Sequence, residues 1–102
     1  MRIVVADTTA SGAETARLLL ADVPSPVRLR ELIRHRVREE VARSGGHPGD
    51  WEAQAEAAVK AFGRNGFFVF VGDRQVEDLD EELTLAEADV VSFVRLVPLA
   101  GG

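Results

Sequence analysis

The feature that most constrains the fold of this chain is the order of its apolar patterns. Short runs with strand-like spacing stand near both ends, and two segments with helical spacing lie between them. Apolar strands from the two ends are best buried at the centre of one sheet, with the helices packed on one side of it. A chain of 102 residues can bury one hydrophobic core. We therefore predict a single α+β domain.

The strand predictions follow the alternation of apolar and polar residues. Residues 2–9 and 14–22 form an expected antiparallel hairpin, joined by a turn that contains Gly12. The most apolar run, 67–71, begins a second hairpin, and the last strand is expected at 90–96. The first and last strands are the ones best suited to the sheet centre.

The second hairpin continues, after a glycine turn, into the short strand Gln75-Val76. The acidic segment 78–89 that follows is predicted to be a loop. Its leucines, Leu79, Leu83 and Leu85, are expected to fill the core from this loop.

Helix start and stop signals place the two helices. Ser25 is a good N-cap residue, and Pro26 suits the first helical position, so the first helix is expected to begin there and to end near Gly45. A second helix is predicted from its N-cap Asp50 to Gly63. Its apolar stripe has two large anchors, Trp51 and Phe62.

The composition excludes several classes of function. The chain has no cysteine, which excludes disulfides, a thiolate nucleophile and a cysteine-ligated metal, and two histidines are too few for most metal sites. No spacing indicates an acid–base pair, a serine triad or a phosphate-binding loop. No apolar run suits a membrane span, and the start does not resemble a signal peptide. We expect a cytoplasmic protein that is not an enzyme and binds neither metal nor membrane.

The net charge of −5 is unevenly distributed. Residues 27–43 contain six arginines, and residues 73–89 contain eight acids. Such asymmetry can orient a domain on a partner, although two solvated faces are the simpler interpretation. The arginine helix lacks interleaved aromatic residues and the chain is acidic overall, so no nucleic-acid partner is expected. The acidic segment 78–82 is expected to be a solvated loop rather than a cation site.

The chain ends in Pro98-Leu99-Ala100-Gly101-Gly102. Glycine has no Cβ, so a Gly-Gly end can pass through a narrow channel and adopt backbone angles closed to other residues. We expect a domain over residues 1–97 and a flexible tail over 98–102. The expected functional group is the carboxylate of Gly102.

Two segments resemble the ubiquitin-like β-grasp superfamily. Residues 69–78 resemble the third-strand hairpin of ubiquitin. Residues 89–93 and the ending 98–102 resemble the small subunit of molybdopterin synthase and the thiamine-pathway sulfur carrier. The resemblance implies a β-grasp fold with a mixed sheet of four to five strands, a main helix and an extra helix. The extra helix belongs to an insertion at 44–63, which is longer than in these families.

The resemblance implies that the carboxylate of Gly102 is the conjugation and adenylation site. An E1-like adenylating enzyme would use ATP to activate it, so the chain itself would bind no cofactor. The tail residues Pro98, Leu99, Ala100 and Gly101 would be recognised by that enzyme. Ubiquitin has arginines just before its glycines, which argues against activation by ubiquitin's own enzyme.

The sequence and the resemblance leave three functions open. A ubiquitin-like modifier would pass from adenylate to thioester, with an E2-like conjugating enzyme as a possible further partner, and then to an amine of a target protein. A sulfur carrier would form a thiocarboxylate at Gly102 for molybdopterin, thiamine or tRNA thiolation and would meet a sulfur-acceptor enzyme. A non-covalent β-grasp interaction module would not use the tail.

A second candidate surface lies on the last strand. If Val91 and Phe93 face the helices, Val94 and Leu96 point to the opposite face, where ubiquitin-like proteins present a docking patch. Arg95 lies between them and completes the candidate patch. The alternative is that the extra helix and the loops bury the last strand on both faces, and alternation cannot decide between the two.

Overall fold

Seven strands and two α-helices build the domain, which is seen here in a computed structural model that describes residues 1–45 and 47–95. In chain order they are β1 (Ile3–Thr9), β2 (Glu14–Leu20), β3 (Val27–Arg28), α1 (Leu29–Ser44), the short 3₁₀ helix η1 (Pro48–Asp50), α2 (Trp51–Gly63), β4 (Phe67–Val71), β5 (Arg74–Val76), β6 (Glu82–Leu83) and β7 (Val90–Arg95).

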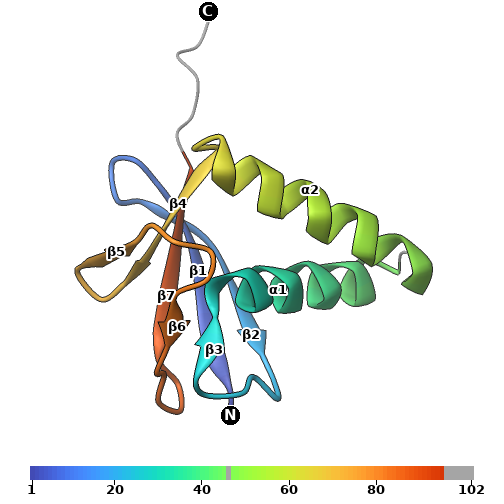
Figure 1. Cartoon of the computed structure of the whole chain (residues 1–102), viewed down its shortest axis with the longest axis horizontal. Helices are drawn as coiled ribbons and strands as arrows, with labels where there is room; N and C mark the ends of the chain where they lie inside the picture. Colours follow the sequence, from blue (N-terminus) through green and yellow to red (C-terminus); the bar gives the residue numbers. More distant parts are fainter. Residues whose placement is uncertain (46, 96–102) are drawn as a thin grey trace, which may run out of the picture.

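Five strands form the main sheet in the order β2-β1-β7-β4-β5. β1 and β7 are parallel neighbours, and the other pairs in this sheet are antiparallel. Both helices lie on the same side of the sheet, with α2 running back alongside α1 (Figure 1). The predicted α+β class, with a mixed sheet and two helices, is confirmed. The arrangement is compatible with a β-grasp fold.

The core lies between α1 and the sheet. The inward faces of β1, β7 and β4 contribute Val5, Val91 and Val69, which are all at most 1% exposed. α1 contributes Leu32 and Ile33 to the same cluster. Burying one such side chain stabilises the fold by about 1.5–3 kcal/mol, so this layer is the main source of stability.

α1 begins later than the sequence predicts. Its N-cap is Arg28, not Ser25, and that side chain makes no capping hydrogen bond. Instead, the first helical amides donate to the acidic loop, Leu29 to the carbonyl of Glu81 (3.1 Å) and Arg30 to the carbonyl of Leu79 (2.9 Å). Because a distant loop satisfies these amides, the local capping signal does not set the helix start.

Ser25 joins this loop rather than the helix. Its Oγ donates to the carbonyl of Leu85 and accepts from the amide of Leu85, both at 3.0 Å. Nearby, β3 pairs with β6, with Val27 opposite Leu83. The predicted loop therefore contains a short strand, and the burial of Leu83 and Leu85 from this segment is confirmed.

The predicted ends of the helices agree better with the structure. Gly45 ends α1 with a left-handed φ of 75°, and α2 starts directly after Asp50. Beyond α2, the amide of Gly66 donates to the carbonyl of Ala61 at 2.7 Å. A Cβ at Gly66 would stand 2.9 Å from that oxygen, so the sharp entry into β4 requires glycine.

We predict that Ser25→Ala lowers the free energy of unfolding by about 1–2 kcal/mol, because both backbone groups of Leu85 lose their partner. Urea denaturation measures this change. Ser11→Ala is the matched control, since Ser11 bonds only Thr9 in an exposed turn, and it should change stability by less than about 0.5 kcal/mol. Equal effects of the two substitutions would contradict the assigned role of Ser25.

Candidate functional site

The base of the tail is held at the end of β7. β7 lies between β1 and β4, and Arg95, the last described residue, stands opposite Thr9 on one side and Phe67 on the other. Pairing on both sides therefore holds the end of β7 within the sheet. The predicted site residues Leu96 and 98–102 lie outside the described residues.

Two residues of the predicted docking patch point to opposite faces of the sheet. Val94 is half-buried and shares the face opposite the helices with Thr8 and Phe68. Arg95 lies on the helix side, where it lines a cavity of about 80 Å³ with Phe93 and Phe67. The structure therefore brings Val94, but not Arg95, to the open face.

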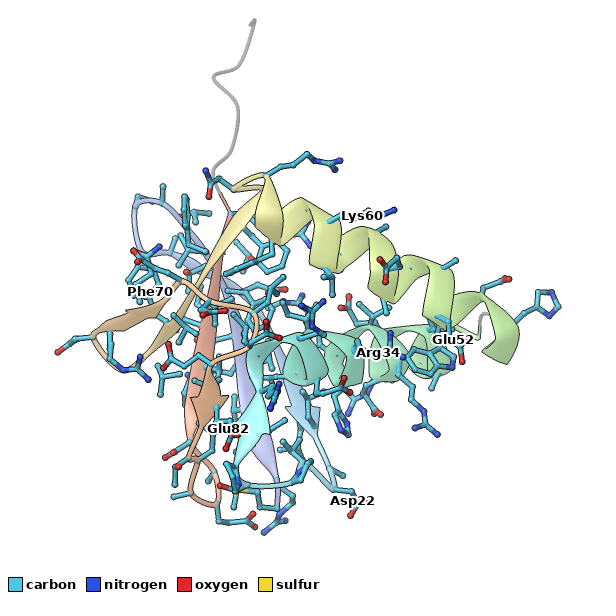
Figure 2. The ribbon with its side chains drawn as sticks, viewed as in Figure 1. Asp22, Arg34, Glu52, Lys60, Phe70 and Glu82 are labelled. Carbon is cyan, nitrogen blue, oxygen red and sulfur yellow. The ribbon has the colours of Figure 1, made fainter. Side chains whose placement is uncertain are left out.

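This open face is apolar and partly exposed. The face includes Leu19, which is 44% exposed, and Val90, which is 39% exposed. Phe68 and Phe70 are half-buried there, and Phe70 points away from the helices (Figure 2). Among residues 1–45 and 47–95, no helix covers this face, because α2 packs beside α1. The last strand is therefore buried on the helix side only.

A buried arginine, Arg36, connects α1 to the sheet near the end of β7. The side chain of Arg36 is 8% exposed and donates two hydrogen bonds to the carboxylate of Asp7 on β1, one of them at 2.6 Å. Its Nε donates to Glu40 at 2.7 Å. Its guanidinium also lies 4.7 Å from the centre of the Phe93 ring on β7. One side chain thus joins the helix to two of the three inner strands, β1 and β7.

The charge of Arg36 is retained in this position. Burial by itself lowers its pKa, but the hydrogen bonds and charges of Asp7 and Glu40 outweigh burial, so the pKa of Arg36 is raised. The sequence carries a signal for this contact, which the prediction of a strand at residues 2–9 does not use. Alternation along β1 places Asp7 on the inward face with Ile3 and Val5, where an unpaired carboxylate would be costly.

The contact between Trp51 and the arginines of α1 was also not predicted from the sequence. Trp51, expected as an apolar anchor, is half-buried against two arginines of α1. The guanidinium carbons of Arg34 and Arg38 lie 5.1 and 5.7 Å from the centre of its ring. Arginines four residues apart share a helix face, and the antiparallel return of α2 brings Trp51 over them.

The two charged segments of the sequence partly neutralise each other. Arg30 approaches Asp80 at 3.4 Å, and Arg28 approaches Glu82 at 3.9 Å. Exposed pairs of this kind each contribute little stability. They do show that the start of α1 faces the acidic loop. The two charged segments are therefore not two separate solvated faces.

Two further classes of site are absent from the described part of the chain. There, no three side chains of histidine, cysteine, aspartate or glutamate gather as metal ligands would. Neither helix has the length and the apolar character needed to cross a membrane. In comparisons with protein-family models, with curated proteins and with solved structures, no match was found.

We predict that Asp7→Ala lowers the free energy of unfolding by about 3 kcal/mol, because it leaves the buried charge of Arg36 without its bidentate partner. A double-mutant cycle with Arg36→Met should give a coupling energy of roughly 1–3 kcal/mol. Urea denaturation of the four proteins measures it.

The exposed pair Arg43 and Glu39, 2.9 Å apart on the same helix, is the matched control. Its cycle should give a coupling of only about 0.3–0.5 kcal/mol. If the two cycles gave the same coupling energy, the contact between Arg36 and Asp7 would not be what positions α1 on the sheet.

Proposed function

We propose that this chain is a ubiquitin-like protein modifier. An E1-like enzyme would adenylate the carboxylate of Gly102 with ATP, pass it to a thioester and deliver it to an amine of a target protein. The chain itself would be the substrate of this chemistry and not a catalyst. The observation that carries the proposal is that β7, an inner strand of a β-grasp-compatible sheet, is followed after five residues of the sequence by Gly101-Gly102.

The anchored base of the tail supports this proposal. Arg95 is held by strand pairing on both sides, and seven residues follow it in the sequence. Seven residues can span at most about 25 Å when fully extended. A partner enzyme would therefore dock on the rigid domain and reach Gly102 at a bounded distance from it.

The charge around the tail also favours activation by ATP. The carboxylate must approach a polyphosphate, so acidic side chains nearby would oppose the reaction. Between Val90 and Gly102 the only charged side chain is that of Arg95. The proposal requires Gly102 to carry the free carboxylate, which the intact mass of the protein from its host would verify.

Chain formation between copies would have few acceptor sites. Lys60 is the only lysine, and it projects from the outer side of α2 (Figure 2). The N-terminal amine instead donates to the carbonyl of Val23 at 3.0 Å. We propose Lys60 as the accessible amine if polymers form.

A sulfur carrier is the second candidate, and the sequence of the ending favours it. Pro98, Leu99 and Ala100 stand before the glycines, as in the sulfur-carrier resemblance, and no arginine does. In this function, a sulfur donor attacks the acyl-adenylate and displaces AMP, so that Gly102 becomes a thiocarboxylate.

Mass spectrometry of the tail tests both functions. The chain is incubated with an extract of its host and ATP, and the products are digested with trypsin, which cuts after Arg95. For a modifier, we expect the segment Leu96–Gly102 attached to target lysines through Gly102. For a sulfur carrier, we expect one carboxylate oxygen of Gly102 replaced by sulfur.

Two variants control this experiment. Deletion of Gly101 and Gly102 should abolish either product. Gly63→Ala, at a position where a Cβ meets nothing within 4 Å, should leave it unchanged. An unmodified carboxylate, together with full biological function of the deletion variant, would rule out both candidates and leave a non-covalent interaction module.

A further inference from the structure

The helices α1 and α2 carry a cluster of side chains that has no role in the chemistry proposed for Gly102. It consists of Arg34 and Arg38 on α1 and Trp51 at the start of α2, and we name it the Arg–Trp–Arg surface. Arg34 lies in the first half of α1 (Figure 2). We propose that this surface binds an acidic segment of a partner protein through the carboxylates of that segment.

The geometry prepares the two arginines for carboxylates. The guanidinium carbons lie 5.1 and 5.7 Å from the centre of the Trp51 ring, and a guanidinium packed on a ring can still donate from the N–H groups that point away from it. Those N–H groups match the two oxygens of a carboxylate. Packing against the ring also limits the rotamers of both side chains, which reduces the entropy lost on binding.

The charge balance of α1 singles out the same two residues. Arg36 and Arg43 have close acidic partners, and Arg30 faces the acidic loop. Arg38, by contrast, makes no ion pair within residues 1–45 and 47–95. Arg34 approaches only Glu31, at 3.8 Å. The surplus positive charge of the helix is therefore concentrated at the Arg–Trp–Arg surface.

The shape of the surface suits small anionic groups. Its three side chains, with Glu31 and His35, line a hollow of about 100 Å³. A nucleic-acid base that stacks on Trp51 would compete with the two arginines for its ring. The net charge of −5 also opposes a polyanion, so an acidic peptide is the better fit.

This inference does not depend on the function of the tail, because Gly102 takes no part in it. It can be tested on the full chain without any activating enzyme. Trp51 is the only tryptophan, and tyrosine is absent, so the fluorescence of the protein reports on this surface directly.

The test is a fluorescence titration of the full chain with a hexaglutamate peptide at low salt. We expect a saturable change in Trp51 emission and an affinity that falls as salt rises. Arg34→Gln combined with Arg38→Gln should weaken binding by about tenfold or more, because two charge-assisted contacts are lost. Circular dichroism confirms that the variant is folded.

Two controls separate a shaped site from general positive charge. Arg43→Gln removes a charge from the same helix away from Trp51 and should leave the affinity within about twofold. Arg34→Lys with Arg38→Lys keeps both charges but loses the planar fork, and it should still weaken binding several-fold.

Several outcomes would overturn the proposal. These are no saturable change with hexaglutamate, an equal loss in the Arg43→Gln control, and full affinity in the double lysine variant. Tighter binding of a single-stranded oligothymidylate than of hexaglutamate would assign the surface to nucleic acid instead. Self-association that Arg34→Gln and Arg38→Gln abolish would make a second copy the occupant.

Discussion

The ion pair between Arg36 and Asp7 is the interaction on which the placement of α1 depends. Taking two charges out of water is costly, and only good geometry offsets that cost. Here the guanidinium has hydrogen bonds to two carboxylates and the face of Phe93 against it. An arginine that can be satisfied in one orientation fixes the rotation of its helix over β1 and β7. The apolar layer supplies most of the stability, and we infer that this contact favours one orientation of α1 over others.

The rotation set by Arg36 decides what the other arginines of α1 can do. With Arg36 facing the sheet, Arg30 at the start of the helix faces the acidic loop, where Asp80 stands. Arg34 and Arg38 then face α2 and meet Trp51. One residue type thus has three roles on one helix: a buried contact with the sheet, a weak contact with the acidic loop, and a surface that is only partly neutralised by Glu31. Counting charges along the sequence cannot separate these roles, because each is assigned by a neighbour that is distant in the chain.

The difference between contacts with nearby residues and contacts with residues distant in the chain explains how much of the fold and of the site could be predicted. Alternation recovered β1 and β7, where Ile3 and Val5, and Val91 and Phe93, are buried at every second residue. The strands β2, β4 and β5 were also predicted, although each has only one buried residue. The start of α1 was predicted wrongly at Ser25, since the carbonyls of Leu79 and Glu81 satisfy its amides from a loop about 50 residues away. The two-residue strands β3 and β6 carry too few residues for any period. Trp51 was correctly placed on an apolar stripe, but only the antiparallel return of α2 reveals that arginines lie against it.

The arrangement separates the surfaces on which a partner could act. β7 ends near the last turn of α2, whereas Trp51 is the first residue of that helix (Figure 1). Thirteen helical residues span about 20 Å, so these two surfaces are far enough apart to be occupied together. The open apolar face lies on the other side of the sheet from both helices. An enzyme bound at the tail would therefore leave the Arg–Trp–Arg surface accessible. Since two of its residues lie on α1 and one on α2, the surface depends on the packing of the two helices and not on the chemistry proposed for Gly102.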